Sequence, residues 1–135
     1  MTVQDLRLLD VFEQSGGIIV LDATENGERI LPLPFDRLRM QADPVGELAR
    51  TYFESIPDVF QRPNSRLYEW LGKEIRRAGA RSVILLRQVW CDKWHAEVAR
   101  LREALAVPLL DLDLDGEDMQ MRHRMRIQAF LEDLA

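Results

Sequence analysis

The stretch Ser82-Val-Ile-Leu-Leu-Arg-Gln-Val-Trp-Cys-Asp-Lys-Trp-His95 decides the fold, because it joins a buried strand to the start of a helix. Residues 83–86 form an apolar run that is too short to span a membrane and is typical of a strand covered on both faces. We therefore predict a parallel strand over residues 82–89. Its carboxyl end delivers Cys91, and Asp92 is predicted to cap the following helix.

Two more strands are expected beside this one. Ile18-Ile-Val-Leu21 is a second short apolar run, and Asp22 closes it. A third strand is predicted from Val107 to about Asp113. Strands that alternate with helices indicate a parallel sheet with right-handed crossovers.

The helices are predicted from apolar residues at helical spacing and from the residues that typically begin and end a helix. Residues 30–42 contain two prolines and are expected to form an irregular crossover. The first expected helix ends at Gly16-Gly17, the third runs from Pro63-Asn64-Ser65 to Gly79, and the fourth runs from Asp92 to about Leu105. The second runs from Asp43-Pro44 to Pro57, and its apolar stripe consists of Val45, Leu48, Tyr52 and Phe53. The last runs from about Glu117 to Leu134, and its buried side is expected to carry Met121, Met125, Ile127, Phe130 and Leu131.

These elements predict an α/β fold, namely a small three-layer α/β/α domain with a short parallel sheet of three to four strands and right-handed βαβ crossovers. The segment between the first two strands could add the fourth strand at an edge. A chain of 135 residues corresponds to about one domain, so residues 1–135 are expected to form a single α/β domain. Because three strands are few, the alternative is that this sheet belongs to a larger molecule and is seen here in part.

Composition and charge exclude several classes of function. An apolar fraction of 47% is sufficient for a core, and a net charge of −5 argues against general nucleic-acid binding. A single cysteine excludes an internal disulfide framework and favours a reducing compartment. The sequence has no secretion signal and no membrane-spanning apolar run. A cytoplasmic protein that binds neither nucleic acid nor membrane is therefore expected.

Cys91 is the first candidate for chemistry, because ligands of open α/β sheets bind at the carboxyl ends of strands. A thiol at a helix N-terminus has a stabilised thiolate that favours metal binding or nucleophilic attack. The alternative is a small buried hydrophobic residue. His95, one turn into the helix, could pair with Cys91, or it could be a solvated histidine. Trp90 and Trp94 flank this position as pocket walls or as packing residues.

Three polar groups are weaker candidates. The loop after the first strand carries Glu25, Glu28 and Arg29, which are expected at the same sheet edge as Cys91 and are otherwise an ordinary polar turn. Alternating carboxylates could bind magnesium, or they could mark a strand that frays into a loop. Basic residues on the last helix could bind an acidic partner or the phosphates of coenzyme A, or they could form a solvated face. The carboxylates are Asp111, Asp113 and Asp115, and the basic residues are Arg122, His123, Arg124 and Arg126.

Four segments together resemble a known family: Leu9-Asp-Val-Phe-Glu-Gln-Ser-Gly-Gly-Ile-Ile-Val-Leu-Asp22, Pro63-Asn64, Val83-Ile-Leu-Leu-Arg-Gln-Val-Trp-Cys-Asp92 and Arg126-Ile-Gln-Ala-Phe-Leu-Glu-Asp-Leu134. Their order and spacing are similar to the carboxyl-terminal domain of the 2-hydroxyacyl-CoA dehydratase and benzoyl-CoA reductase family, which includes the D-component of 2-hydroxyglutaryl-CoA dehydratase. The resemblance covers about residues 8–134.

The resemblance implies an iron–sulfur enzyme component. Proteins of this family bind a [4Fe–4S] cluster through cysteine thiolates, and an ATP-dependent activator protein delivers an electron to it. The cluster passes the electron to the thioester carbonyl of an acyl-CoA, and the ketyl radical that results allows elimination or ring reduction. By this resemblance Cys91 is a metal ligand. The substrate-pocket candidates, taken from the loop after the first strand and from the neighbours of Cys91, are Glu25, Gly27, Arg29, Trp90, Asp92 and His95.

The sequence also departs from the family pattern. Glu25 stands where the family has a cysteine, whereas Gly27 and Arg29 match, and residues 56–58 lack the cysteines that members can carry. One thiolate cannot hold a cubane cluster, so the isolated chain is expected to bind none. The full-length assembly would add an amino-terminal domain or a paralogous subunit. The alternatives are a cluster-free scaffold of the same family and a small thiol enzyme using Cys91 and His95.

Overall fold

The computed structural model describes residues 3–114 and 119–134, and the side chains of residues 8–114 and 121–134. Its central element is a parallel sheet of two strands, β1 (Val83–Gln88) and β2 (Leu109–Leu114), in which Val83 pairs with Leu109 and Gln88 pairs with Leu114. Helix α5 (Asp92–Ala104) connects the strands and completes one βαβ unit. The mixture of helices with a short parallel sheet is confirmed, whereas the predicted sheet of three to four strands is reduced to two among the described residues.

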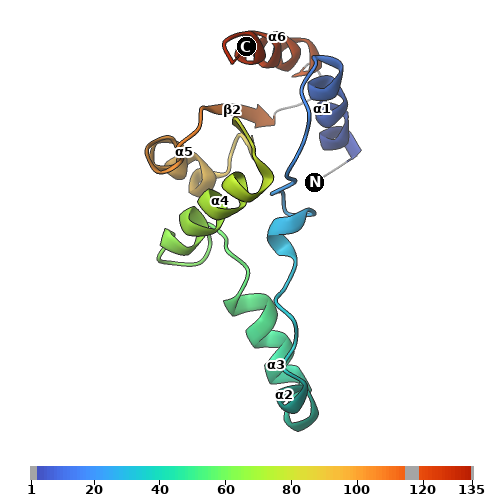
Figure 1. The fold of residues 1–135 in the computed structure, drawn as a ribbon, viewed down its shortest axis with the longest axis vertical. Helices are drawn as coiled ribbons and strands as arrows, with labels where there is room; N and C mark the ends of the chain where they lie inside the picture. Colours follow the sequence, from blue (N-terminus) through green and yellow to red (C-terminus); the bar gives the residue numbers. More distant parts are fainter. Residues whose placement is uncertain (1–2, 115–118, 135) are drawn as a thin grey trace.

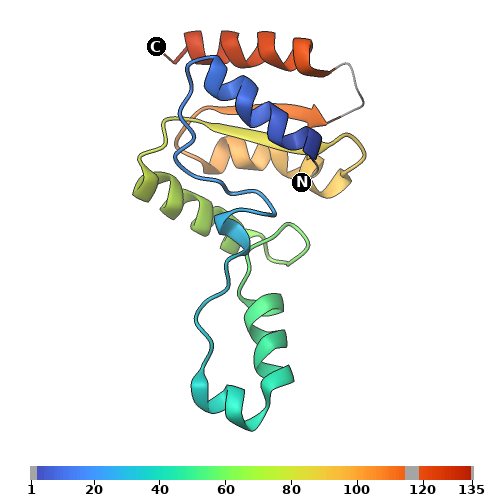
Figure 2. The same cartoon turned by 90° about the vertical axis from the view of Figure 1, so that its right-hand side faces the viewer.

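The remaining helices lie on both sides of this sheet. Helices α4 (Ser65–Ala78) and α5 pack together on one side, while α1 (Val3–Gln14) and α6 (Met119–Glu132) pack together on the other (Figure 2). Gly79 ends α4 in the left-handed conformation at φ 67°, as the sequence predicts. The main core lies under α4 and α5 and contains Val59, Leu67, Leu71, Ile75, Leu101 and Leu105.

The predicted first strand does not form. Residues 17–23 belong to no helix or strand, they make no ladder with β1 or β2, and Ile18 and Val20 are exposed. A cavity separates this segment from β1, which therefore keeps one unpaired edge. The apolar pattern of Ile18-Ile-Val-Leu21 is typical of a strand, but strand pairing needs a neighbour at hydrogen-bonding distance, and the pattern does not encode one.

A second departure concerns residues 33–55, which we call the arm. The arm extends away from the rest of the molecule in both views (Figures 1 and 2). It contains α2 (Arg37–Ala42), α3 (Pro44–Ala49) and a π-helical turn, η2 (Arg50–Glu54). Asp43 caps α3 by accepting a hydrogen bond from the Gly46 amide at 2.9 Å, as predicted, whereas the short helix α2 replaces part of the expected irregular crossover.

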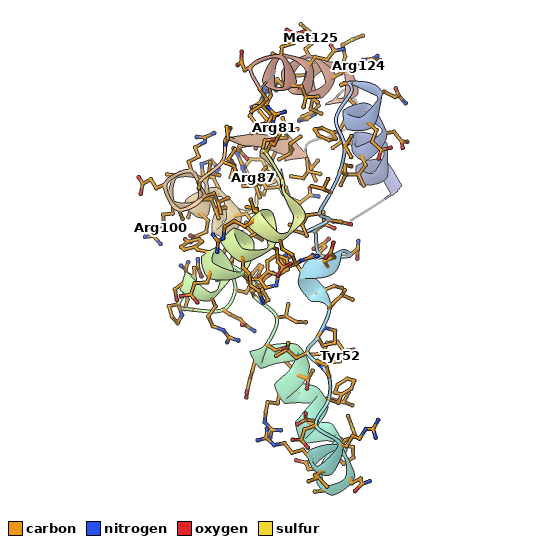
Figure 3. All side chains as sticks on the ribbon, viewed as in Figure 1. Tyr52, Arg81, Arg87, Arg100, Arg124 and Met125 are labelled. Carbon is orange, nitrogen blue, oxygen red and sulfur yellow. The ribbon has the colours of Figure 1, made fainter. Side chains whose placement is uncertain are left out.

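The buried side of α6 also differs from the prediction. His123 and Ile127 are buried and Phe130 and Leu131 are half-buried, but Met121 and Met125 are exposed. Residues four apart lie on one helix face, so a face through 123 and 127 points 121 and 125 outward. Figure 3 shows Met125 on the outer side of α6. The predicted start of this helix at Glu117 lies outside the described residues.

Candidate functional site

Cys91 lies at the junction between β1 and α5. The Cys91 amide donates to the Gln88 carbonyl at 3.0 Å, and the Cys91 carbonyl accepts from the His95 amide at 2.9 Å, which begins the helix. Cys91 itself occupies the N-cap position, and its thiol is half-buried. The expectation that Asp92 caps the helix was therefore wrong by one position. Asp92 is the first helical residue, where its negative charge is favourable beside the helix N-terminus.

A cavity of about 1020 Å³ lies between the segment at residues 17–25 and β1. Its walls are mainly apolar side chains from that segment, from β1 and from α6, and Cys91 and Trp94 line one part of it. Ligand pockets of proteins typically measure about 300–1,000 Å³ and are largely apolar with a few polar groups. The cavity is therefore mainly apolar and lies at the upper end of the sizes of ligand pockets.

The structure brings three of the predicted site residues to this cavity, namely Glu25, Arg29 and Cys91. The other four, Gly27, Trp90, Asp92 and His95, do not line it. Trp90 is 90% exposed, so its ring forms no wall, and the side chains of Asp92 and His95 are exposed on the first turn of α5. The functional role of each of these residues stays a prediction.

Arg29 is buried in a set of internal contacts. Its Nε donates to the Ala23 carbonyl at 3.0 Å, and its Nη1 donates to the Pro57 carbonyl at 3.1 Å and forms an ion pair with Asp58. The guanidinium also lies over the Trp94 ring, 5.6 Å from the ring centroid. Arg29 thus joins the loop after residue 23, the turn at residues 57–58 and helix α5, and its charge is already balanced by a carboxylate.

Gly27 has a steric role in the same loop. The Glu28 amide donates to the Asp22 carbonyl at 2.6 Å, so the loop folds back on its own start. A Cβ atom on Gly27 would lie 2.2 Å from the Asp22 carbonyl oxygen, which is backbone and cannot move aside. Only glycine fits this close approach, and the tight loop directs Arg29 toward the interior.

Glu97 of α5 is the centre of a buried polar cluster that was not predicted from the sequence. The Glu97 carboxylate is fully buried and accepts hydrogen bonds from the Tyr68 hydroxyl and from Arg62 Nη1 at 3.2 Å. Burial raises the pKa of Glu97, but the hydrogen bond from Tyr68, the nearby Asn64 amide and the positive charges of Arg100 and Arg62 outweigh it and lower the pKa below its ordinary value. A glutamate on an amphipathic helix is normally expected on the solvated face, so the burial of Glu97 becomes visible only in the folded structure.

The alternating carboxylates of β2 contact an arginine. Asp111 accepts two hydrogen bonds from Arg87, at 2.8 and 3.0 Å, and Asp113 forms an ion pair with the same guanidinium. The hydrogen bond to Asp111 and the two negative charges raise the pKa of Arg87 despite its burial. Figure 3 shows Arg87 inside the body of the molecule. Asp115, the third carboxylate of the pattern, lies outside the described residues.

The basic residues of α6 separate into two groups. His123 is buried, and Arg126 donates to the Asp111 carbonyl at 2.7 Å, so these two face the sheet. Arg122 and Arg124 are exposed, and Figure 3 shows Arg124 on the outside of the helix. The predicted basic patch is therefore reduced to Arg122 and Arg124 on the solvent side.

The residues described do not form a metal centre by themselves. Among the side chains described, those of residues 8–114 and 121–134, no group of three or more His, Cys, Asp and Glu is arranged to hold a metal ion. An iron–sulfur cubane takes four cysteine thiolates, and the chain has one. This part of the chain therefore does not fit a complete cluster on its own.

The comparison with family models gives one match. The model described as "2-hydroxyglutaryl-CoA dehydratase, D-component" matches residues 1–134. The chain belongs to this family. The resemblance seen in the sequence is thereby confirmed, and a D-component is by its name one part of a dehydratase that has further components. No curated protein and no solved structure matched the chain. None of the helices in the described part of this D-component family member has the length and apolar character needed to cross a membrane.

Proposed function

We propose that the chain is a component of a radical 2-hydroxyacyl-CoA dehydratase, and that the cavity beside β1 receives the acyl part of a CoA thioester. The match to the D-component family over residues 1–134 is the observation that carries this proposal. The apolar lining of the cavity supports it, because an acyl chain is the apolar end of the substrate. A ring-reducing relative of the benzoyl-CoA reductase type would use the same apolar space.

The proposed metal ligand is Cys91, as one contributor to a shared [4Fe–4S] site. Its thiol lies at the N-terminus of α5 and lines the cavity beside β1, where a ligand bound in the cavity could reach it. The other ligands would come from an amino-terminal domain or a paralogous subunit of the complete assembly. An ATP-dependent activator protein is the further partner that this proposal requires, and the three-layer domain with its additional strand would be completed in that assembly.

One observation favours a second candidate, a cluster-free scaffold of the same family. Gly27 and Arg29 are the two loop residues that match the family pattern, and both have a structural role in this chain. Gly27 permits the close approach to Asp22, and Arg29 is held by Asp58 and by backbone carbonyls. A loop whose family-like residues maintain the fold could persist in a protein that has exchanged its cysteine for Glu25 and supports a catalytic partner.

Iron analysis separates the two candidates. The native gene product is purified without oxygen together with its co-purifying subunits, and iron and acid-labile sulfide are measured for the wild type, Cys91→Ala and Cys91→Ser. The ligand role predicts that both substitutions lower the iron content. Serine keeps the size of the side chain, so it controls for a packing effect of the smaller alanine. Equal iron in all three proteins, or no iron in any, would overturn the ligand role and leave the scaffold.

A further inference from the structure

The cavity beside β1 is long, and it follows the strand from one end to the other. Every residue of β1 lines it, and so do Ala80, which comes shortly before the strand, and Cys91, which comes shortly after it. The six residues of β1 extend about 20 Å. We call the end of the cavity beside Cys91 the thiol end and the end beside Ala80 the far end, and the length of β1 separates them.

Different elements surround the two ends. At the thiol end, the Ala23 carbonyl accepts a hydrogen bond from Arg29 at 3.0 Å, and the Arg29 guanidinium lies over the ring of Trp94 on the first turn of α5. At the far end, Arg81 lies beside the end of α6 (Figure 3) and donates to the Leu134 carbonyl at 2.7 Å. Ala23 therefore marks the thiol end of the lining, and Leu134 marks the far end.

The positive charges around the cavity do not suit a second carboxylate on the acyl chain. Among the described residues, the cations that line the cavity are Arg29, Arg81 and Arg87. Arg29 forms an ion pair with Asp58, and Arg87 forms ion pairs with two carboxylates of β2. Arg81 is exposed at the far end, where a short dicarboxylic chain that starts at the thiol end does not reach it. A carboxylate buried without a counter-charge is costly, so the cavity favours an uncharged chain.

We propose that the cavity takes a long, uncharged, straight acyl chain, with its thioester at the thiol end and its terminal methyl group at the far end. Each extended residue contributes three backbone bonds, so a chain of about sixteen carbons matches the length of β1. This inference rests on the proposed function, in which the cavity receives the acyl part of a CoA thioester. It departs from the dicarboxylic glutaryl group in the description of the family.

Equilibrium dialysis of the native gene product against CoA thioesters tests the length and charge of the chain. Octanoyl-CoA, hexadecanoyl-CoA and glutaryl-CoA are compared at concentrations below those at which micelles form. Burial of one methylene group tightens binding by about fourfold at most, so hexadecanoyl-CoA is expected to bind at least about 100-fold more tightly than octanoyl-CoA. Glutaryl-CoA is expected to bind at least about 10-fold more weakly than octanoyl-CoA, because its second carboxylate lacks a partner.

Matched substitutions of alanine by phenylalanine test the direction of the chain. Ala80→Phe fills the far end and is expected to weaken hexadecanoyl-CoA binding about 10-fold or more, while octanoyl-CoA binding stays within about twofold. Ala23→Phe fills the thiol end and is expected to weaken the binding of both. Ala99→Phe, on the exposed side of α5 and outside the lining, is the control and is expected to change neither. Circular dichroism confirms that each variant is folded.

The possible results separate this inference from the proposed function. Equal binding of octanoyl-CoA and hexadecanoyl-CoA by the wild type would overturn the long chain and leave the acyl site in place. Glutaryl-CoA that binds as tightly as hexadecanoyl-CoA would overturn the uncharged chain. Octanoyl-CoA binding that is lost in Ala80→Phe and kept in Ala23→Phe would overturn the direction. If no thioester binds, the acyl site of the proposed function is itself wrong, whereas the cluster role of Cys91 is decided separately by the iron analysis.

Discussion

The body and the arm of this molecule distribute polarity in opposite ways. In the body, Leu101 and Leu112 are buried while the charged residues of α4 and α5 largely face water. In the arm, a glutamate and a threonine are buried, and the aromatic Phe53 is exposed. The comparison teaches that the body is stabilised mainly by its own core, whereas the arm is stabilised mainly by helix caps and local hydrogen bonds. The same kind of helix can therefore serve as core or as surface, depending on its neighbours.

The largest expected effect is on stability, when one apolar side chain is truncated in each region. We expect Leu101→Ala in the body to lower the free energy of unfolding by about 2–5 kcal/mol, because it leaves a cavity in the core. Phe53→Ala in the arm removes a larger but exposed side chain, and it is expected to change the free energy of unfolding by about 0.5 kcal/mol or less. Urea denaturation of dilute protein measures both. Equal losses would show that the arm belongs to the core.

The second largest effect is expected at the contact that joins the loop after residue 23 to the body. Arg29→Met should destabilise the fold by about 2–3 kcal/mol, below the range for a fully buried pair because Asp58 is partly exposed. The double variant Arg29→Met/Asp58→Asn removes the unpaired carboxylate and should recover part of the loss. Denaturation midpoints of the wild type, both single variants and the double variant form the cycle. Additive losses would mean that the ion pair is not coupled.

Substitutions of two glycines by alanine are expected to change stability in opposite directions, because one glycine is required sterically and the other lies inside a helix. Gly27→Ala should lower stability by about 1–3 kcal/mol, because the new methyl group collides with the Asp22 backbone. Gly72→Ala in the middle of α4 should instead raise stability by up to about 1 kcal/mol, because alanine favours the helix and only the end of the Arg76 side chain is near. Thermal unfolding of the pair shows the two opposite signs. A stabilising Gly27→Ala would remove the steric role of this glycine.

The smallest effect concerns the pH dependence of stability and the buried carboxylate of Glu97 in the body. Because the pKa of Glu97 is lowered on folding, its charge stabilises the folded state above the ordinary glutamate pKa of about 4.3, and that contribution is lost as the pH falls through the lowered pKa. Glu97→Gln should therefore flatten the loss of stability below about pH 4.3. Urea midpoints between neutral pH and pH 3 measure it. An unchanged acid slope would contradict the lowered pKa.

The position of the candidate site could be predicted from the sequence, but the contacts of its side chains could not. The position of Cys91 at the end of a strand followed from a local apolar run and a local helix start, and the structure has both. The partners of Arg29 could not be found in this way, because Asp58 lies 29 residues further along the chain. The buried Glu97 was missed for the same reason, since its partners Arg62 and Tyr68 come from another element.

The sequence by itself determined the elements whose signals are local. Apolar runs and periodicity indicate β1, β2, α4 and α5, and Asp43 and Gly79 mark helix ends through backbone chemistry within a few residues. Only the tertiary structure decided which faces are covered. It left Ile18-Ile-Val-Leu21 unpaired, turned the Met121 side of α6 and the Phe53 side of the arm outward, and opened the cavity beside β1. Burial is a property of distant neighbours, and no local pattern specifies them.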